Sequence, residues 1–178
     1  MDPLIAYSIP IKGLHFGIHQ FDFQIDRHFF ENFDYSPIQE AAIDLKLELD
    51  RRPDMYVLLF HLKGTVQTEC DRCLAGIDLP IEDTQQLVVK LSADEQIGDD
   101  DVIFIHPDTS RFQIAEYIYE YICLAMPMIK RYDCEADDNP KCDQEMLRRL
   151  LQQEDTIESK EEEGENPIWD ALKKWKNQ

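Results

Sequence analysis

Two cysteines separated by two residues, Cys70 and Cys73, stand in the stretch TECDRCLAGIDLP, which follows a long apolar run. Structural zinc sites take four thiolate or imidazole ligands and often draw two of them from a Cys-x-x-Cys turn. A redox pair has the same spacing, but its thiolate is usually stabilised by a helix N-terminus. Here Gly76 and an extended segment follow the pair. The spacing favours zinc over redox chemistry and leaves a third interpretation open, two ordinary thiols at a turn.

Two more cysteines lie in RYDCEADDNPKCDQ, a stretch rich in Asp, Asn and Pro that is typical of a loop able to turn around an ion. The fifth, Cys123, lies in an amphipathic segment, where small buried thiols are ordinary core residues. An odd number of cysteines argues against a disulfide framework. Seven residues separate the two loop cysteines, which is wider than the usual metal-ligand spacing. The most economical ligand set for a structural zinc cofactor is Cys70, Cys73, Cys134 and Cys142.

The net charge restricts the class of partner. It is −19, from 18 Lys and Arg against 37 Asp and Glu in 178 residues. Non-specific nucleic-acid binding depends on Lys and Arg that displace counterions, so this surface repels RNA, whereas it attracts basic proteins. We expect any contact with RNA to be either local, through a small basic group near the cysteines, or indirect, through a basic protein; the alternative is that the side chains of this group are simply solvated. That group is Arg72, Lys130 and Arg131.

Targeting signals are not evident. The opening residues, MDPLIAYSIPIKGLHF, lack a basic region followed by an apolar stretch. No apolar run approaches the roughly 20 residues needed to span a membrane. Neither a Gly-rich phosphate loop nor a His-Glu-x-x-His motif indicates an enzyme class. We therefore expect a cytoplasmic, non-enzymatic globular protein, most simply a monomer.

Alternation of apolar and polar residues predicts strands through most of the first half of the chain. The clearest case is AAIDLKLELD at 41–50, whereas MYVLLFHL at 55–62 is apolar at successive positions, as expected of a strand covered on both faces. Gly64 is expected to mark a bulge, and Pro80 an edge or a bulge. The remaining predicted strands are 19–26, 77–92 and 102–107.

Helical periodicity follows the strands. Apolar residues from Ile114 to Ala125 recur at helical spacing up to Pro127, and EMLRRLLQQ predicts a second helix. The sequence thus predicts an α+β fold, a twisted antiparallel sheet of about six strands followed by C-terminal helices. We expect one domain over 1–157, an acidic linker over 158–165 and a short docked helix over 166–178. The apolar face of that last helix packs either on the chain's own core or on a partner; it comprises Trp169, Leu172 and Trp175.

Three stretches together resemble the YceD-like family of large ribosomal RNA subunit accumulation proteins. They are ECDRCL at 69–74, FQIAEYIYEYICLAMPMI at 112–129 with Cys134 soon after, and ENPIWDALKKW at 165–175. The resemblance carries over Cys70, Arg72, Cys73 and Cys134, together with the terminal segment. It implies a non-enzymatic role in accumulation of large-subunit ribosomal RNA, and hence in ribosome assembly.

The resemblance and the charge together predict an assembly factor that acts by binding a basic ribosomal protein or a precursor of the large subunit. Two rival interpretations remain open. The first is a thiol-redox protein that uses Cys70 and Cys73. The second is a scaffold that binds basic proteins outside ribosome assembly.

Overall fold

The computed structural model describes residues 3–93, 102–133, 142–150 and 152. The chain forms two compact units. The first combines Met1–Glu69 with Gly76–Lys130, and the second combines Cys70–Ala75 with Arg131–Gln178. The predicted linker at 158–165 and the terminal helix at 166–178 lie outside the described residues.

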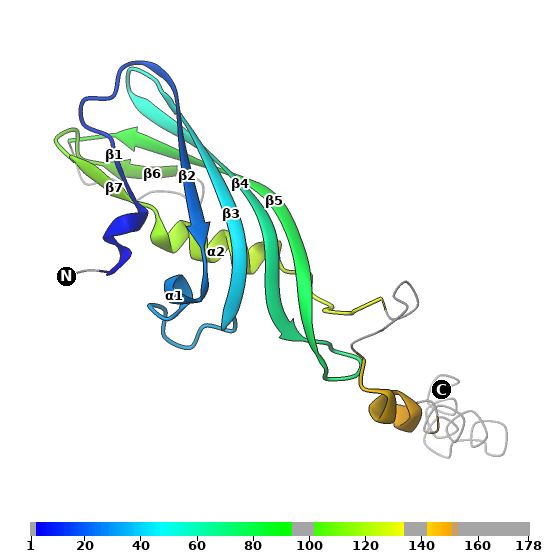
Figure 1. Cartoon of the computed structure of the whole chain (residues 1–178). Coiled ribbons are helices and arrows are strands. Elements are labelled where there is room, and N and C mark those ends of the chain that lie inside the picture. Colours follow the sequence, from blue (N-terminus) through cyan, green and yellow to red (C-terminus); the bar gives the residue numbers. More distant parts are fainter. Residues whose placement is uncertain (1–2, 94–101, 134–141, 151, 153–178) are drawn as a thin grey trace, which may run out of the picture. The chain divides into compact units, whose positions relative to one another are not determined.

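A five-stranded sheet dominates the first unit, and its strand order is β2-β3-β4-β5-β6 (Figure 1). The strands are β2 (Gly17–Ile25), β3 (Glu40–Arg51), β4 (Met55–Glu69), β5 (Gly76–Leu91) and β6 (Val102–Ile105). Neighbouring strands are antiparallel from β2 to β5, whereas β6 is parallel to β5. The predicted α+β class is confirmed. The expectation of a wholly antiparallel sheet is wrong at β6, because an apolar pattern marks a strand without giving its direction.

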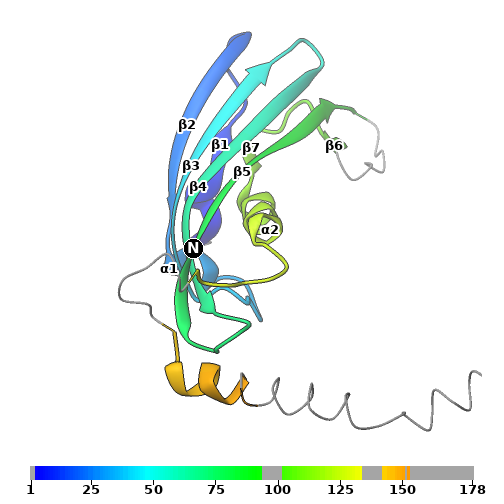
Figure 2. The same cartoon turned by 90° about the vertical axis from the view of Figure 1, so that its right-hand side faces the viewer.

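The side chains of the long strands alternate between two environments. On β4, Tyr56, Leu58 and Phe60 are buried, whereas the intervening Val57 and Leu59 are only half-buried. The prediction that this strand is covered on both faces is therefore wrong. Apolar residues on the open face mimic the sequence of a fully buried strand, although within the described residues of this unit the helices cover only one face (Figure 2).

The helix α2 (Ala115–Ala125) covers the buried face and confirms the amphipathic helix predicted from Ile114 to Ala125. Ile118 and Ile122 are completely buried in the core. The ring of Tyr121 meets that of Phe60 on β4 edge-on, with 5.1 Å between centroids. Each fully buried aliphatic side chain contributes about 1.5–3 kcal/mol of transfer free energy. The apolar side of α2 thus covers the apolar side chains on this face of the sheet.

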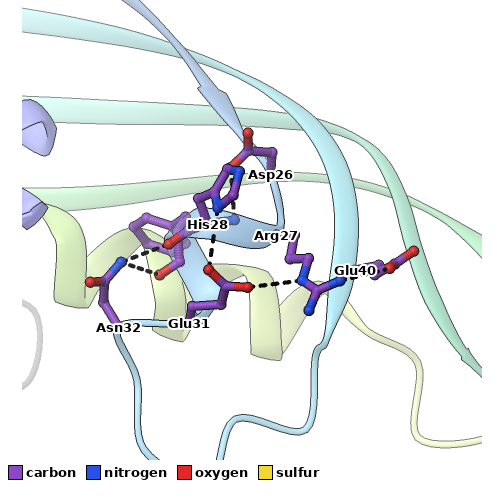
Figure 3. A network of polar contacts seen from close by, with 7 residues as sticks. Asp26, Arg27, His28, Glu31, Asn32 and Glu40 are labelled. Carbon is purple, nitrogen blue, oxygen red and sulfur yellow. Dashed lines mark hydrogen bonds and ion pairs between the residues drawn. The ribbon is translucent and has the colours of Figure 1, made fainter.

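The short helix α1 (Arg27–Phe30) precedes β3 and is held by a network of polar contacts (Figure 3). The Asp26 carboxylate accepts a hydrogen bond from the His28 backbone N–H at 3.0 Å, which caps the helix. Arg27 pairs with Glu31 at 2.9 Å and with Glu40 at 3.5 Å. Side-chain hydrogen bonds with Arg27, which has the larger effect, and with His28 hold the pKa of Glu31 below its usual range. These exposed pairs orient α1 relative to β3 and add little stability.

A second sheet pairs β1 (Ser8–Pro10), which follows the 3-10 helix η1 (Pro3–Tyr7), with β7 (Arg111–Gln113). The guanidinium of Arg111 donates 2.9 Å hydrogen bonds to the hydroxyl and to the carbonyl oxygen of Ser8. Ile9, at the centre of β1, is completely buried. The sequence did not predict this sheet, because strands of three residues are too short to show an alternating pattern.

Gly64 does not mark a bulge, contrary to expectation. The register runs without interruption from Ile43 through Gly64 to Ile81. A Cβ atom at Gly64 would lie 2.1 Å from the Ala42 carbonyl oxygen and 2.6 Å from the Ile43 Cα. Glycine is needed here because two backbones approach each other closely. Within the described part of the chain, Pro80 lies at an edge of the sheet as expected, since β6 pairs with the last four residues of β5 and not with Pro80.

In the second unit, residues 144–150 are helical, which confirms the second predicted helix over the part that is described. The Asp143 carboxylate caps this helix by accepting hydrogen bonds from the backbone N–H groups of Glu145, at 2.9 Å, and Met146, at 3.0 Å. Among the described residues, no helix has the length and apolar character needed to cross a membrane.

Replacing Gly64 by alanine tests this close approach. We expect Gly64→Ala to lower the free energy of unfolding by about 3 kcal/mol, because backbone atoms of β3 must move to admit the methyl group. The measurement is the midpoint of urea denaturation. Gly76→Ala is the matched control: it lies on the next strand, a Cβ there meets nothing within 4 Å, and its stability should not fall. Equal stability of the two variants would contradict the account.

Candidate functional site

The Cys-x-x-Cys stretch forms a tight turn between β4 and β5. The Cys70 backbone N–H donates to the Ala75 carbonyl at 2.9 Å, and the Leu74 N–H donates to the Cys70 carbonyl at 2.9 Å. Leu74 has a φ of 59°, in the left-handed region that non-glycine residues seldom adopt. The turn therefore places both cysteines on a closed loop rather than at a helix N-terminus, as the sequence predicted.

The sulfur of Cys70 lies among hydrogen-bond donors. Burial opposes ionisation of this thiol, but backbone N–H groups donate to the sulfur and outweigh that effect, so its pKa is lowered to about 7. The donors are, in order of effect, Tyr132, Cys73 and Arg72, and the Cys73 thiol adds a further hydrogen bond. Donation of several N–H groups to one sulfur stabilises a thiolate, the form in which cysteine binds a metal. The first two predicted ligands thus lie in one turn, and their binding of a metal stays a prediction.

The donor Tyr132 brings the chain that follows α2 to the turn. Cys70–Ala75 and the segment from Arg131 onward belong to the same compact unit. This grouping unites the sequence ranges of the four predicted zinc ligands, although Cys134 itself lies outside the described residues. No group of three or more His, Cys, Asp or Glu side chains that could hold a metal occurs within the described ranges.

The oxidation state differs among the cysteines. Cys70 and Cys73 are free thiols and are each 1% exposed. Cys142 is also buried and is disulfide-bonded in this structure. Zinc binds the thiolate form of cysteine, so a disulfide-bonded cysteine must first be reduced. Cys142 would therefore serve as a ligand only in its reduced form. Cys123 is a half-buried thiol on α2, where burial raises its pKa, as expected of a packing residue.

The predicted basic group is divided between the units. Arg72 and Arg131 are exposed in the second unit, whereas Lys130 is half-buried in the first. There Lys130 lines a hollow of about 370 Å³ with Gln67 and Glu69 among others. Trp169, Leu172 and Trp175, the predicted partner-binding face of the terminal helix, lie outside the described residues.

Sequence reasoning missed an exposed apolar segment at the end of α2. Leu124, Met128 and Ile129 are 70%, 99% and 64% exposed, respectively. The run CLAMPMI at 123–129 looks like core sequence because nearly all of its residues are apolar. Its one contrary signal is Pro127, which cannot continue the helix and so indicates that the residues after it do not belong to the buried side of α2.

These features define the class of protein: a small α+β protein with a Cys-x-x-Cys turn in the chain between β4 and β5. More particularly, the chain belongs to the YceD family, because the family model described as "Large ribosomal RNA subunit accumulation protein YceD" matches residues 58–176. That range begins within β4 and includes the cysteine turn and α2, so the resemblance inferred from the three motifs is confirmed. The family's description is that of an accumulation factor and names no catalytic activity. No curated protein and no solved structure matches the chain significantly.

The lowered pKa of Cys70 predicts a specific titration in reduced, metal-free protein. Thiolate absorbance in the ultraviolet should rise as the pH is raised through about 7, since a lowered pKa populates the thiolate above that pH. Cys70→Ser should abolish this step. Cys123→Ser, the matched control, should leave it unchanged because burial raises the pKa of that thiol. Persistence of the step in Cys70→Ser would contradict the assignment.

Proposed function

We propose that this protein is a cytoplasmic, non-enzymatic factor needed for accumulation or processing of large-subunit ribosomal RNA, and that it acts by binding. The observation that carries the proposal is the family match over residues 58–176, which includes the cysteine turn and α2. The exposed apolar residues after α2 are consistent with an interaction surface rather than with a substrate pocket.

The charge of the chain supports a basic protein as the direct partner. A net charge of −19 opposes a grip on bare RNA, whose phosphates are bound by displacing counterions with Lys and Arg. The same charge accelerates encounter with a basic ribosomal protein, free or within a large-subunit precursor. Contact with RNA would be local, through Arg72, Lys130 and Arg131.

We further propose that Cys70, Cys73, Cys134 and Cys142 together hold a structural zinc ion when all four are reduced. The buried sulfur of Cys70, with its backbone N–H donors, supports this ligand set. The grouping of Cys70–Ala75 with the chain after Arg131 in one unit also supports it. A tetrahedral zinc would crosslink the two segments of that unit. The first unit has its own core, so the metal would order a local clip rather than the whole fold.

A thiol-redox protein is the second candidate, and the lowered pKa of Cys70 is the observation that favours it. Against it stands the burial of both sulfurs, because redox-active thiols need access to their substrate. The third candidate is a scaffold for basic proteins outside ribosome assembly. The negative charge of the chain supports it equally, but this candidate predicts no association with ribosomal precursors.

Loss of the protein tests the role in assembly. Depletion should lower large-subunit ribosomal RNA relative to small-subunit RNA and reduce free large subunits in a sucrose gradient. Wild-type protein supplied in trans should restore both. An unchanged subunit profile would contradict the proposal, and recovery of basic proteins that are not ribosomal would favour the third candidate.

A measurement of zinc content distinguishes the structural zinc site from the thiol-redox candidate. Protein purified under reducing conditions should carry zinc in an equimolar amount, which Cys142→Ser and Cys73→Ser should each diminish and Cys123→Ser should not. Chelation should accelerate hydrogen exchange in residues 127–142 and leave the sheet protected. Zinc-free wild-type protein whose cysteines oxidise reversibly would instead support the redox candidate.

A further inference from the structure

The sheet of the first unit has one face without a described covering element. Figure 2 shows α1 and α2 against the opposite face. The register aligns one apolar row across all five strands of the uncovered face: Ile18 faces Asp50, which faces Val57, and the row continues through Val88 to Val102. Four of these five residues are apolar. Ile18 is 63% exposed and the three valines are half-buried.

Carboxylates surround this row. Side chains that point away from α2 on β2 to β5, strands that are described throughout, include eight Asp or Glu and three Lys. Some are neutralised, as Glu82 is by Lys63 at 2.9 Å. Asp22, Asp44 and Glu48 form no ion pair with any residue in the described ranges. This uncovered side of β2–β5, with its apolar row, is called the acidic face below.

A hollow of about 380 Å³ lies on the acidic face. The residues that line it include Asp22, Lys46, Glu48 and His61. The carboxylates of Asp22 and Glu48 outnumber the one lysine of the hollow, Lys46, which faces Asp22 across the strands, so the hollow keeps a net negative charge that favours an incoming cation. A flexible Lys or Arg side chain fits such a hollow, since its aliphatic stem covers apolar surface while its charge meets the carboxylates.

We propose that the acidic face binds a basic polypeptide segment, rich in Lys and Arg and with aliphatic residues between them. Charge complementarity selects this occupant. RNA is repelled by the carboxylates, and a second copy of the chain brings a further charge of −19. The aliphatic residues of the segment cover the Ile18–Val57–Val88 row, and its cations meet Asp22, Asp44 and Glu48. The inference rests on the proposed function, because it supplies the surface by which a basic ribosomal protein would be held.

The test is binding of a fluorescent peptide of alternating Lys, Val and Arg to the full-length protein. The triple variant Asp22→Asn, Asp44→Asn, Glu48→Gln should bind about tenfold more weakly than wild type, as expected for the loss of several exposed charge pairs. The matched control removes the same charge elsewhere: Asp34→Asn, Glu116→Gln and Glu120→Gln. Its affinity should stay within about twofold of wild type, because its altered residues do not lie on the acidic face. A second variant, Val57→Thr with Val88→Thr, should also weaken binding although it leaves the charge unchanged.

Equal weakening of the two charge variants would overturn the inference, since peptide binding would then report net charge alone. Competition by a single-stranded RNA oligonucleotide for the same site would also overturn it. So would peptide binding that appears only after residues 166–178 are removed, because that result assigns the face to the chain's own terminal segment. None of these results depends on ribosomal RNA levels, so failure of the acidic face and failure of the proposed function remain distinguishable.

Discussion

The unbroken antiparallel register of β3, β4 and β5 is the constraint on which the rest of this structure depends. It runs from Glu40 to Arg51 on β3 and aligns each residue with its partners on β4 and β5. Because side chains alternate, a slip by one residue would exchange the two faces of the sheet and send Asp44 and Glu48 into the core. The close approach at Gly64 helps to hold this register, since other registers would place side chains against the backbone of β3.

Two surfaces of opposite character follow from that single register. One set of side chains forms a core with α2, in which Phe60 meets Tyr121. The other set carries carboxylates and a row of aliphatic residues. The cysteine turn belongs to the second compact unit, apart from this core. A stable core that carries an exposed charged surface on the same sheet suits a protein that acts by binding, and it agrees with a family described by accumulation of ribosomal RNA rather than by a reaction.

Elements with a long periodic pattern were predictable from the sequence. The strand at 41–50 and the helix from Ile114 to Ala125 each offer several repeats, so their buried faces can be assigned without a structure. The two-stranded sheet of β1 and β7 could not be found, because three residues contain no period. MYVLLFHL was misread because Val57 and Leu59, which look like core residues, lie on the uncovered face. The direction of β6 depends on how the preceding chain returns, which local pattern does not encode.

The candidate site divides in the same way. Residue type and spacing identified Cys70 and Cys73 as metal-ligand candidates, and the structure places both in one hydrogen-bonded turn. The hydrogen bond from Tyr132 was not predictable, because it joins segments far apart in the sequence. The acidic face was also missed. Its carboxylates come from four strands, and only the register between strands brings them together.

Site-specific photo-crosslinking in growing cells would test most directly that this protein acts by holding a basic protein. A photoreactive residue is placed at Gln20 or Gln86, both exposed on the acidic face, and as a control at Glu120 on α2. The account predicts that Gln20 and Gln86 yield adducts with a basic protein of the large ribosomal subunit, and that Glu120 yields far fewer. Adducts with ribosomal RNA from the acidic face, or equal protein adducts from all three positions, would contradict it.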